Sequence, residues 1–433
     1  MNEIVIGRLQ DLGTQGRILI GKHYVQMGQT TALSNPVFLD VATSHVVLVV
    51  GKRGGGKSYT MGVLAEGLTE LPKDVAQNLS TVILDTMGVF WTMKFPNLME
   101  RQMLADWNLK AKGMNVQIYT PIGYYASYKQ QGIPTDFPFS IKPGEISGQD
   151  WCASFSLSPI SEVGVLIERV IAALKEKGDF SMEDVIATLR NDTDSEKVAR
   201  EAAINLFTIA QSWGVFHDKG TPLADLVQPG QATILDVSCY ATLPDGWRIK
   251  ALVVALVCQK LFAERMDQRK GEEFDLIHKT SEFSAKPQGK RMPLVWVMLD
   301  EAHEFLPSEG TTLASFPLTT ILREGRQPGI SLVLATQQPG KISQDAMTQA
   351  DVVIAHRVTA KVDTDALGTL MQSYMREGLT SMMDNLPRDK GSAIVFDDCN
   401  EKMYPLMIRP RLTWHGGGAP SAVDIKRKLF DLS

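Results

Sequence analysis

Gly51-Lys-Arg-Gly-Gly-Gly-Lys57-Ser58 is the stretch of sequence that decides the fold. It satisfies the pattern G-x-x-x-x-G-K-[ST], in which glycine backbone N–H groups surround the phosphates of a nucleotide. Its context agrees, because an apolar run at Val46–Val50 enters it and a helical pattern at Tyr59–Leu71 leaves it. A glycine-rich turn that matched by chance would lack this strand and helix. The stretch therefore predicts a phosphate-binding loop between a buried strand and a helix.

Each residue type in this loop has a chemical reason. Glycines leave room for consecutive backbone N–H groups to face the phosphates, and the following helix N-terminus adds partial positive charge. We expect Lys57 to neutralise the β- and γ-phosphates of ATP, and Ser58 to hold Mg²⁺ through its hydroxyl. The predicted nucleotide-binding residues are Gly51, Gly54, Gly55, Gly56, Lys57, Ser58 and Tyr59.

A second apolar run ends in two adjacent acids, Asp300 and Glu301. An ATPase needs a carboxylate to hold Mg²⁺ and a base to orient the attacking water. We predict that Asp300 holds Mg²⁺ through a coordinated water and that Glu301 polarises the water that attacks the γ-phosphate. A strand that ends in two solvated acids is the plain alternative. Together with the phosphate-binding loop, the pair predicts an ATPase with ATP and Mg²⁺ as its cofactors.

Three further side chains are candidates for contacts with the γ-phosphate of a nucleotide. Gln337 follows the run Ile330–Ala335 after Thr336, and its amide could sense whether that phosphate is present. Arg326 and Arg323 fall on the preceding helix and turn, at an edge of the domain. An arginine at such an edge can stabilise transition-state charge on a neighbouring subunit's nucleotide. A surface arginine with a salt-bridge partner fits the spacing equally well.

Short β-branched runs recur along the chain, with helical patterns between several of them. Nearly continuous apolar runs are typical of strands buried on both faces of a parallel sheet. Helical patterns follow at Lys250–Met266 and Thr311–Glu324 as well as after the phosphate-binding loop. The alternation indicates an α/β fold with a mostly parallel central sheet. The predicted strands are Val46–Val50, Thr81–Asp85, Val116–Tyr119, Ala232–Val237, Leu294–Asp300, Ile330–Ala335 and Val352–Ala355.

Residues 144–229 depart from this alternation, since they contain mainly helical patterns. We predict that they form a helical insertion, with helices at Glu162–Lys175, Met182–Leu189 and Ser195–Ser212. Residues 1–36 are expected to form a short N-terminal β segment. Residues 37–143 and 230–433 are expected to form a RecA-like P-loop NTPase core with a C-terminal tail. The polar segment Gly271–Arg291 predicts an exposed loop.

The composition is typical of a globular protein with a sizeable core. Of the 433 residues, 44% are hydrophobic and 21% are charged, which is a usual balance. The four cysteines are scattered without a C-x-x-C pair, which favours neither a zinc site nor a disulfide framework. No apolar run approaches the roughly 20 residues of a membrane span, and the N-terminus lacks the blocks of a signal peptide. We therefore expect a cytoplasmic protein without membrane contact.

Asp85-Thr-Met-Gly88 matches the D-x-x-G string of GTPases. Those enzymes also recognise guanine with an N-K-x-D string, which this sequence lacks. The nearest string, Ala360-Lys-Val-Asp363, has alanine in place of the asparagine. The match therefore does not indicate a GTPase.

In combination, these strings resemble the HerA/FtsK group of ring-forming ATPases, and its HerA branch in particular. They follow the family's order from about residue 40 to the C-terminus. The stronger matches are Gly51–Ser58, Leu299–Pro307, Arg323-Glu-Gly-Arg326 and Leu334–Pro339. The weaker matches are Asp85-x-x-Gly88, Leu226–Asp236 and Arg409-Pro-Arg411-x-Thr-x-His415-Gly-Gly.

The resemblance implies a homohexamer around a channel, motion along double-stranded DNA, and often a separate nuclease partner. It also implies that Arg326 acts in trans and that the C-terminal tail reaches toward a neighbouring subunit. Two features depart from the family pattern. The family usually begins with a barrel domain that contributes to partner docking, whereas here only the residues before Val46 precede the first core strand. The family's D-x-x-G commonly continues with Glu, and this chain has Val89 there.

The sequence leaves more than one function open. The leading hypothesis is a hexameric ATPase that translocates on or remodels double-stranded DNA with a nuclease or effector partner. The alternative is an ATP-dependent ring platform that assembles an effector, for example in antiviral defence, with little translocation. A motor that moves protein or single-stranded substrates is a third option. The net charge of −5 does not distinguish these three functions, because an acidic ring can enclose a basic channel. Candidate DNA contacts are Trp91, Lys94, Lys341 and the lysines of Gly271–Arg291.

Overall fold

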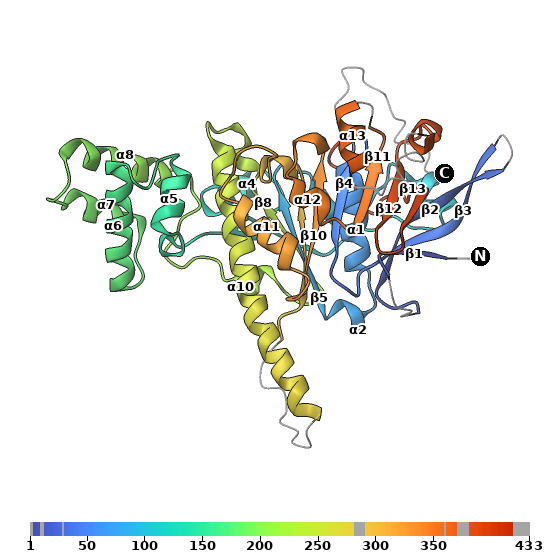
Figure 1. The fold of residues 1–433 in the computed structure, drawn as a ribbon, viewed down its shortest axis with the longest axis horizontal. Coiled ribbons are helices and arrows are strands. Elements are labelled where there is room, and N and C mark those ends of the chain that lie inside the picture. The colour runs from blue at the N-terminus through green and yellow to red at the C-terminus, as the bar shows by residue number, and fades with distance from the viewer. Residues whose placement is uncertain are drawn as a thin grey trace.

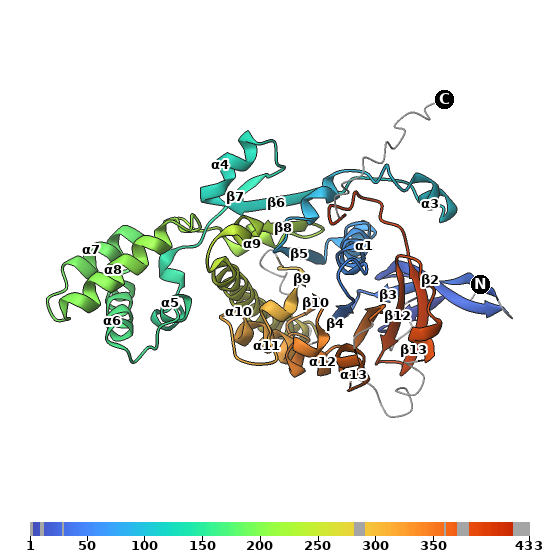
Figure 2. The ribbon, with the colours of Figure 1, turned by 90° about the horizontal axis from the view of Figure 1, so that it is seen from above.

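The structure is a computed structural model that describes residues 3–8, 13–27, 30–280, 291–358, 361–369 and 381–418. Its described strands form one sheet of 13 strands, which runs through the body of the molecule (Figure 1). Helices cover both faces of the sheet, and a separate group of helices lies at one end of the molecule (Figures 1 and 2). This is the α/β architecture with a mostly parallel central sheet that the sequence predicts.

The parallel part of the sheet is the core of the fold. Every neighbouring pair in it is parallel, and every residue of β5, β8, β10 and β11 is buried. Burial of consecutive residues is expected where helices cover both faces of a sheet. In spatial order its strands are β11 (Val352–His356), β4 (Val46–Val50), β10 (Ile330–Thr336), β9 (Leu294–Leu299), β5 (Leu79–Asp85), β8 (Ala232–Asp236), β6 (Val116–Pro121) and β7 (Phe137–Phe139).

Beyond β11 the sheet continues as an antiparallel extension that the sequence did not predict as such. It contains the N-terminal strands, which join the core through the last two strands of the described chain. Its members, in order from the core, are β12 (Ser392–Asp397), β13 (Lys402–Ile408), β2 (Arg17–Met27), β3 (Thr30–Asp40) and, parallel to β3, β1 (Ile4–Ile6). The N-terminal strands and the nucleotide-binding strand β4 therefore belong to one hydrogen-bonded sheet.

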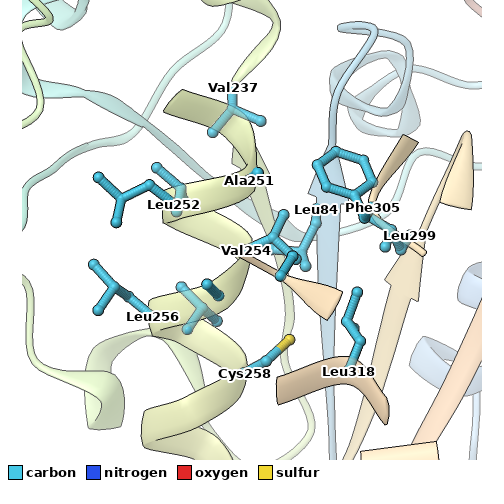
Figure 3. Close-up of a cluster of buried hydrophobic side chains, with 14 of the residues drawn as sticks. Leu84, Val237, Ala251, Leu252, Val254, Leu256, Cys258, Leu299, Phe305 and Leu318 are labelled. Atoms are coloured by element: carbon cyan, nitrogen blue, oxygen red, sulfur yellow. The ribbon is translucent and has the colours of Figure 1, made fainter. Parts of the chain in front are cut away.

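Alternate residues of β4 point into two separate hydrophobic clusters. Val47 and Val49 pack in the cluster that includes α1 (Lys57–Thr69). Leu48 and Val50 pack in the cluster that includes α10 (Gly246–Thr280) and α11 (Ser315–Glu324). Figure 3 shows the second cluster, where side chains of α10 meet those of the sheet and of α11. Because each face of β4 is buried against a helix, the strand that leads into the phosphate-binding loop is held on both sides.

Helices dominate the chain between β7 and β8. Serine side chains cap three of them: Ser147 accepts a hydrogen bond from the Asp150 N–H, Ser161 accepts one from the Gly164 N–H, and Ser181 forms a capping box with Asp184, as is typical of helix starts. Trp151 is fully buried at their centre and packs against Phe155, Phe207 and Phe216. These helices are α5 (Gly148–Ser154), α6 (Glu162–Lys177), α7 (Met182–Arg190), α8 (Lys197–Gln211) and α9 (Leu223–Leu226).

The remaining elements are short and connect the larger ones. They are α2 (Lys73–Ala76), η1 (Phe90–Lys94), α3 (Arg101–Asp106), α4 (Ile122–Gln130), η2 (Pro143–Glu145), η3 (Ser238–Thr242), η4 (Ala302–Glu304), η5 (Pro339–Lys341), α12 (Gln344–Thr348) and α13 (Lys361–Thr369). No helix in the described ranges has both the length and the apolar composition that crossing a membrane requires.

The prediction of a loop from Gly271 was wrong for residues 271–280. There α10 continues to Thr280 and projects beyond the body of the molecule (Figure 1); residues 281–290 lie outside the described residues. Charged pairs along this helix explain the difference. Arg269 contacts Glu272 and Glu273 at helical spacing, and such pairs stabilise a polar helix.

At the amino end of β4, His45 links three segments of the chain. Its Nδ1 lies 2.7 Å from Asp351 and its Nε2 lies 3.3 Å from Asp40; Asp40 also pairs with Arg8 at 2.6 Å. Burial alone lowers the pKa of His45, but the two carboxylates outweigh it and raise the pKa from 6.5 to about 9. Protonated His45 is therefore favoured in the folded protein.

This pKa predicts how stability depends on pH. The folded-state pKa lies above the ordinary value, so the stabilisation is complete below about pH 6.5 and is lost as pH rises through about 9. Each unit of displacement corresponds to about 1.36 kcal/mol, which gives up to about 3 kcal/mol here. We expect His45→Gln to remove this alkaline decline in the free energy of unfolding, measured by urea denaturation between pH 6 and 9.5. The exposed His217, replaced in the same way, should leave the decline unchanged; equal slopes for the unaltered chain and His45→Gln would contradict the assignment.

Candidate active site

The phosphate-binding loop follows β4 and ends at the start of α1. Gly54 and Gly56 have φ values of 73° and 110°, in the left-handed region that favours glycine. The N–H of Gly51 donates to the carbonyl of Thr336 at 3.3 Å, which attaches the loop to β10. Lys57 begins α1 with only 7% of its surface exposed. The glycines thus allow a tight loop that brings the lysine to the end of the strand.

Ser58 and Asp300 meet although they are far apart in the sequence. The Ser58 hydroxyl donates to a carboxylate oxygen of Asp300 at 2.6 Å. Asp300 directly follows β9 and is 3% exposed, and its other carboxylate oxygen accepts the N–H of Glu301 at 2.8 Å. A hydroxyl beside a carboxylate is a donor set that suits Mg²⁺. The structure therefore brings together the two residues predicted to hold the metal.

Glu301 has a strained backbone and a raised carboxyl pKa. Its φ of 51° and ψ of 44° are left-handed, a conformation that costs energy for a residue other than glycine and that clusters at functional sites. One carboxylate oxygen accepts a hydrogen bond from the Gln337 amide at 3.2 Å. The other has no hydrogen-bond partner among the described residues, and His303 lies 3.6 Å from it. Burial and then the charge of Asp300 raise the pKa of Glu301 to about 7.

Gln337 follows β10, the strand that lies between β4 and β9. Thr336 pairs with Val50 at the end of β4, so the amide of Gln337 is placed between the phosphate-binding loop and Glu301. Its bond to Glu301 makes the side chains after β9 and β10 one unit. The structure thus brings Lys57, Ser58, Asp300, Glu301 and Gln337 to the same end of three neighbouring strands.

Tyr59, the last predicted nucleotide-binding residue, is turned toward the C-terminal segment. Its hydroxyl donates to Glu100 at 2.8 Å and accepts the N–H of Arg411 at 2.7 Å. Its ring makes an edge contact with His415 at 5.3 Å between centroids. The backbone N–H of Tyr59 lies in the first turn of α1, where N–H groups lack acceptors within the helix. We therefore expect Tyr59 to contact a nucleotide through its backbone N–H rather than through its hydroxyl.

Sequence reasoning missed a buried ionic network that holds α1. Glu66 is fully buried and pairs with Arg409 at 2.8 Å and Arg411 at 3.2 Å. It also accepts hydrogen bonds from the N–H groups of Leu412 and Thr413, at 3.0 Å each. Burial raises the pKa of Glu66, but the charges of Arg411 and Arg409 outweigh this effect and hold the pKa below its usual range. The Arg-Pro-Arg string was the available signal in the sequence, but its two arginines lie 343 and 345 residues away from Glu66.

A row of aspartates lies beside the site. Leu84 pairs with Leu299, and Asp85 pairs with Asp236, so Asp300, Asp85 and Asp236 follow one another across the sheet. Asp85 accepts N–H groups of residues 87–90 and shapes the D-x-x-G turn. Burial and the neighbouring Asp236 raise the pKa of Asp85 to about 7. The string that resembles a GTPase motif thus orders a loop rather than marking guanine recognition.

The two candidate arginines lie away from this chain's own phosphate-binding loop. Arg323 donates three hydrogen bonds to Asp345, at 2.9, 3.0 and 3.3 Å. Arg326 is exposed in the turn between α11 and β10. Its charge acts on the thiol of Cys399, and no hydrogen bond or ion pair of its side chain is seen within the described residues. That turn lies at the opposite end of β10 from Gln337, roughly 20 Å away for a strand of this length. Arg326 therefore cannot reach the site of its own chain.

The candidate DNA-contact residues differ in how they are engaged. Lys94 donates to both carboxylate oxygens of Asp136 at 2.6 Å, and Trp91 packs edge-on against Phe95. Lys341 is exposed in η5. The side chains of the lysines between 271 and 291 lie outside the described residues.

ATP and Mg²⁺ fit the residues that the structure assembles. The glycine loop leaves backbone N–H groups free of Cβ atoms, Lys57 supplies a positive charge, and Ser58 with Asp300 supplies oxygen ligands. The described residues contain no group of three or more His, Cys, Asp or Glu side chains that could hold a metal by themselves. A cation at Ser58 and Asp300 would therefore take further ligands from a nucleotide and from water.

The fold and this site define a P-loop NTPase of the RecA-like kind. Within that class, the sequence profile of the family described as the central domain of the helicase HerA matches residues 20–257. The match covers more than half of the chain, and the chain belongs to this family. The resemblance inferred from the motifs is confirmed.

Curated relatives agree with the family. The DNA double-strand break repair helicase HerA of Pyrococcus furiosus is 24% identical over 186 residues, which are 40% of this chain and 32% of the relative. That of Saccharolobus solfataricus is 29% identical over 114 residues, 26% of this chain and 21% of the relative. The matched segments thus span a third or less of these relatives.

Two solved structures show the same fold. VirB4 of Thermoanaerobacter pseudethanolicus has a TM-score of 0.55 and 10% identity, covering 92% of this chain and 97% of that one. The plasmid coupling protein TrwB, in complex with ADP and Mg²⁺, has a TM-score of 0.50 and 14% identity, covering 93% and 99%. At these identities the likeness shows the fold alone.

Proposed function

We propose that the protein hydrolyses ATP. The observation that carries the proposal is the convergence of Lys57, the Ser58–Asp300 pair and the Glu301–Gln337 pair after three adjacent strands. Lys57 and the loop N–H groups bind the phosphates, and Ser58 and Asp300 hold the metal ion. Mg²⁺ bound with the nucleotide neutralises charge that develops on the phosphates.

Glu301 orients the attacking water. Its carboxylate oxygen without a hydrogen-bond partner is available to accept a proton from that water, while its other oxygen is fixed by Gln337. The raised pKa, about 7, brings the base close to neutral pH, where general-base catalysis is effective. Gln337 contacts this base directly, so a γ-phosphate that displaces the amide would also move Glu301. This coupling supports the role of Gln337 as a sensor.

We further propose a motor that acts on double-stranded DNA as a hexamer with a nuclease or effector partner. Membership of the HerA family supports this, and the curated relatives are named as DNA double-strand break repair helicases. The exposed position of Arg326, remote from its own site, supports a role at a neighbouring subunit's nucleotide.

We also propose that residues 144–229 form a helical insertion in an ATPase core of residues 37–143 and 230–433, preceded by a short β segment of residues 1–36.

One observation favours the alternative of a ring platform that organises an effector, for example in antiviral defence. Lys94, a candidate DNA contact, is neutralised by Asp136 in this structure. A motor on duplex DNA needs cationic groups for the phosphates. The platform needs none.

Steady-state ATP turnover with and without long linear duplex DNA, alongside the mass in solution, tests the proposal. A hexamer-sized particle whose turnover rises several-fold with duplex DNA is the expected result. The stimulation should fall as salt increases, because phosphate contacts are salt-dependent. A ring with slow turnover that ignores DNA would favour the platform. Absence of any hydrolysis would overturn the proposed activity itself.

A further inference from the structure

His356 is the last residue of β11 and lies against the phosphate-binding loop. Ala355 pairs with Val50, which places His356 beside Gly51, the first residue of the loop. Its side chain is fully buried. A Cβ atom added at Gly51 would lie 2.8 Å from the His356 Cβ, and one added at Gly56 would lie 3.3 Å from the ring atom Cε1. The two ends of the loop therefore pack so tightly against His356 that a larger residue at Gly51 or Gly56 would crowd it.

The hydrogen bonds of the ring define its tautomer. The Nδ1 atom lies 3.2 Å from the carbonyl oxygen of Ser392, and the Nε2 atom lies 2.8 Å from the hydroxyl of Thr60. A carbonyl only accepts hydrogen bonds, so Nδ1 carries the proton and Nε2 accepts from Thr60. Burial lowers the pKa of His356 to about 4, and the charge of Lys57 acts in the same direction. A neutral ring satisfies both partners at once.

The two hydrogen-bond partners of the His356 ring, Thr60 and Ser392, belong to two different elements next to the phosphate-binding loop, α1 and β12. Thr60 lies in the first turn of α1, where its N–H donates to Gly56 at 2.8 Å. Ser392 begins β12, and its hydroxyl bonds to that of Tyr24 on β2 at 2.9 Å. The ring thus joins the start of the nucleotide-binding helix to the antiparallel extension. A side chain that only filled space would need neither bond.

We propose that His356 is a positioning residue for nucleotide binding, which sets the distance between the phosphate-binding loop, the first turn of α1 and strand β12. The inference rests on the proposed binding of ATP at this loop and adds a residue that the loop motif does not contain. Through Thr60, His356 acts on the N–H groups that face the phosphates. It does not itself touch the nucleotide.

The test measures dissociation constants for ADP and ATP, using fluorescent analogues, on the full chain. His356→Asn keeps a donor near Ser392 but cannot reach Thr60, and Thr60→Val removes the donor to Nε2 with little change of shape. Each is expected to weaken ADP binding roughly tenfold, since each breaks a buried hydrogen bond. Because both remove the same interaction, the double variant should bind ADP about as weakly as either single variant.

His45→Gln is the matched control. His45 is also a buried, hydrogen-bonded histidine, but it lies at the other end of β4. It should lower the unfolding midpoint while leaving ADP affinity within about twofold, because distant sites act independently. The proposal is overturned if His356→Asn and Thr60→Val bind ADP like the unaltered chain. It is also overturned if their effects simply add, or if His45→Gln weakens ADP binding as much.

The outcomes separate this inference from the proposed function. An unaltered chain that binds neither ADP nor ATP would contradict nucleotide binding and, with it, this role of His356. An unaltered chain that binds ADP while the variants bind equally well would contradict only the role of His356. If His356→Asn fails to fold, Thr60→Val provides the measurement, because its shape is nearly that of threonine.

Discussion

Replacing Glu301 with glutamine is expected to lower ATP turnover by about a thousandfold, the scale of a lost general base. Glutamine keeps the size of the side chain and a carbonyl oxygen for Gln337, but it cannot accept the proton of the attacking water. Nucleotide binding should be retained, because Lys57 and the Ser58–Asp300 pair are untouched. Turnover by phosphate release and affinity for a fluorescent ATP analogue are the two measurements.

Glu309→Gln is the control for this prediction, since Glu309 lies eight residues further on and is exposed. It should change turnover by less than about twofold, as is usual for a surface change away from the chemistry. Turnover by Glu301→Gln within tenfold of the unaltered chain would contradict the role of Glu301. Loss of nucleotide binding in this variant would instead indicate that the left-handed turn at Glu301 had rearranged.

The same variant also tests Arg326 at a neighbouring subunit. Arg326→Ala is expected to be nearly inactive alone, because an arginine supplied in trans contributes on the order of a thousandfold to such reactions. Mixing it with Glu301→Gln creates interfaces that combine an intact Glu301 with an intact Arg326, so some turnover should return. If no mixing ratio restores turnover, Arg326 does not act in trans.

Replacing Glu66 with glutamine is expected to destabilise the protein by about 3–5 kcal/mol, because removing one partner leaves buried charges uncompensated. Arg409 and Arg411 are 4% and 1% exposed, so water cannot replace the carboxylate. The free energy of unfolding, from urea denaturation followed by circular dichroism, gives the measurement.

Glu70→Gln provides the comparison, because Glu70 is the residue that directly follows the same helix. Glu70 pairs with Lys112 at the surface, and exposed pairs of this kind contribute about 0–1 kcal/mol. Equal stability of the two variants would show that the buried network does not hold α1. Since Glu66 lies beyond the nucleotide-binding end of α1, the remaining folded protein should still bind ATP at low temperature.

The parts of the fold that the sequence predicted are those with local signals. The phosphate-binding loop is contiguous, and its flanking strand and helix are marked by composition within a few residues. Asp300 and Glu301 follow an apolar run directly, so their place after a buried strand is also a local property. The structure adds that Ser58 and Asp300 are in contact, which two separate motifs can suggest but cannot show.

The parts that could not be predicted depend on distant partners. Glu66 lies within a helix where a solvated glutamate would look the same, and its arginines come from the other end of the chain. His356 is a single polar residue after an apolar run, with partners at positions 60 and 392. Strand β13 contains Pro405, which weakens a strand pattern. The sequence predicts a loop at the polar end of α10, because charged pairs rather than an apolar face stabilise this part of the helix.

The Glu66 network also bears on how this protein is made. During synthesis, the phosphate-binding loop, α1 and later Asp300 and Glu301 all leave the ribosome before Arg409 and Arg411. Until those arginines have been synthesised, Glu66 has no counter-charge, and burial of its carboxylate is unfavourable. The nascent chain therefore carries every nucleotide-binding motif before it can complete the helix that organises them. We therefore expect α1 to reach its buried position only after nearly all of the described chain has been synthesised.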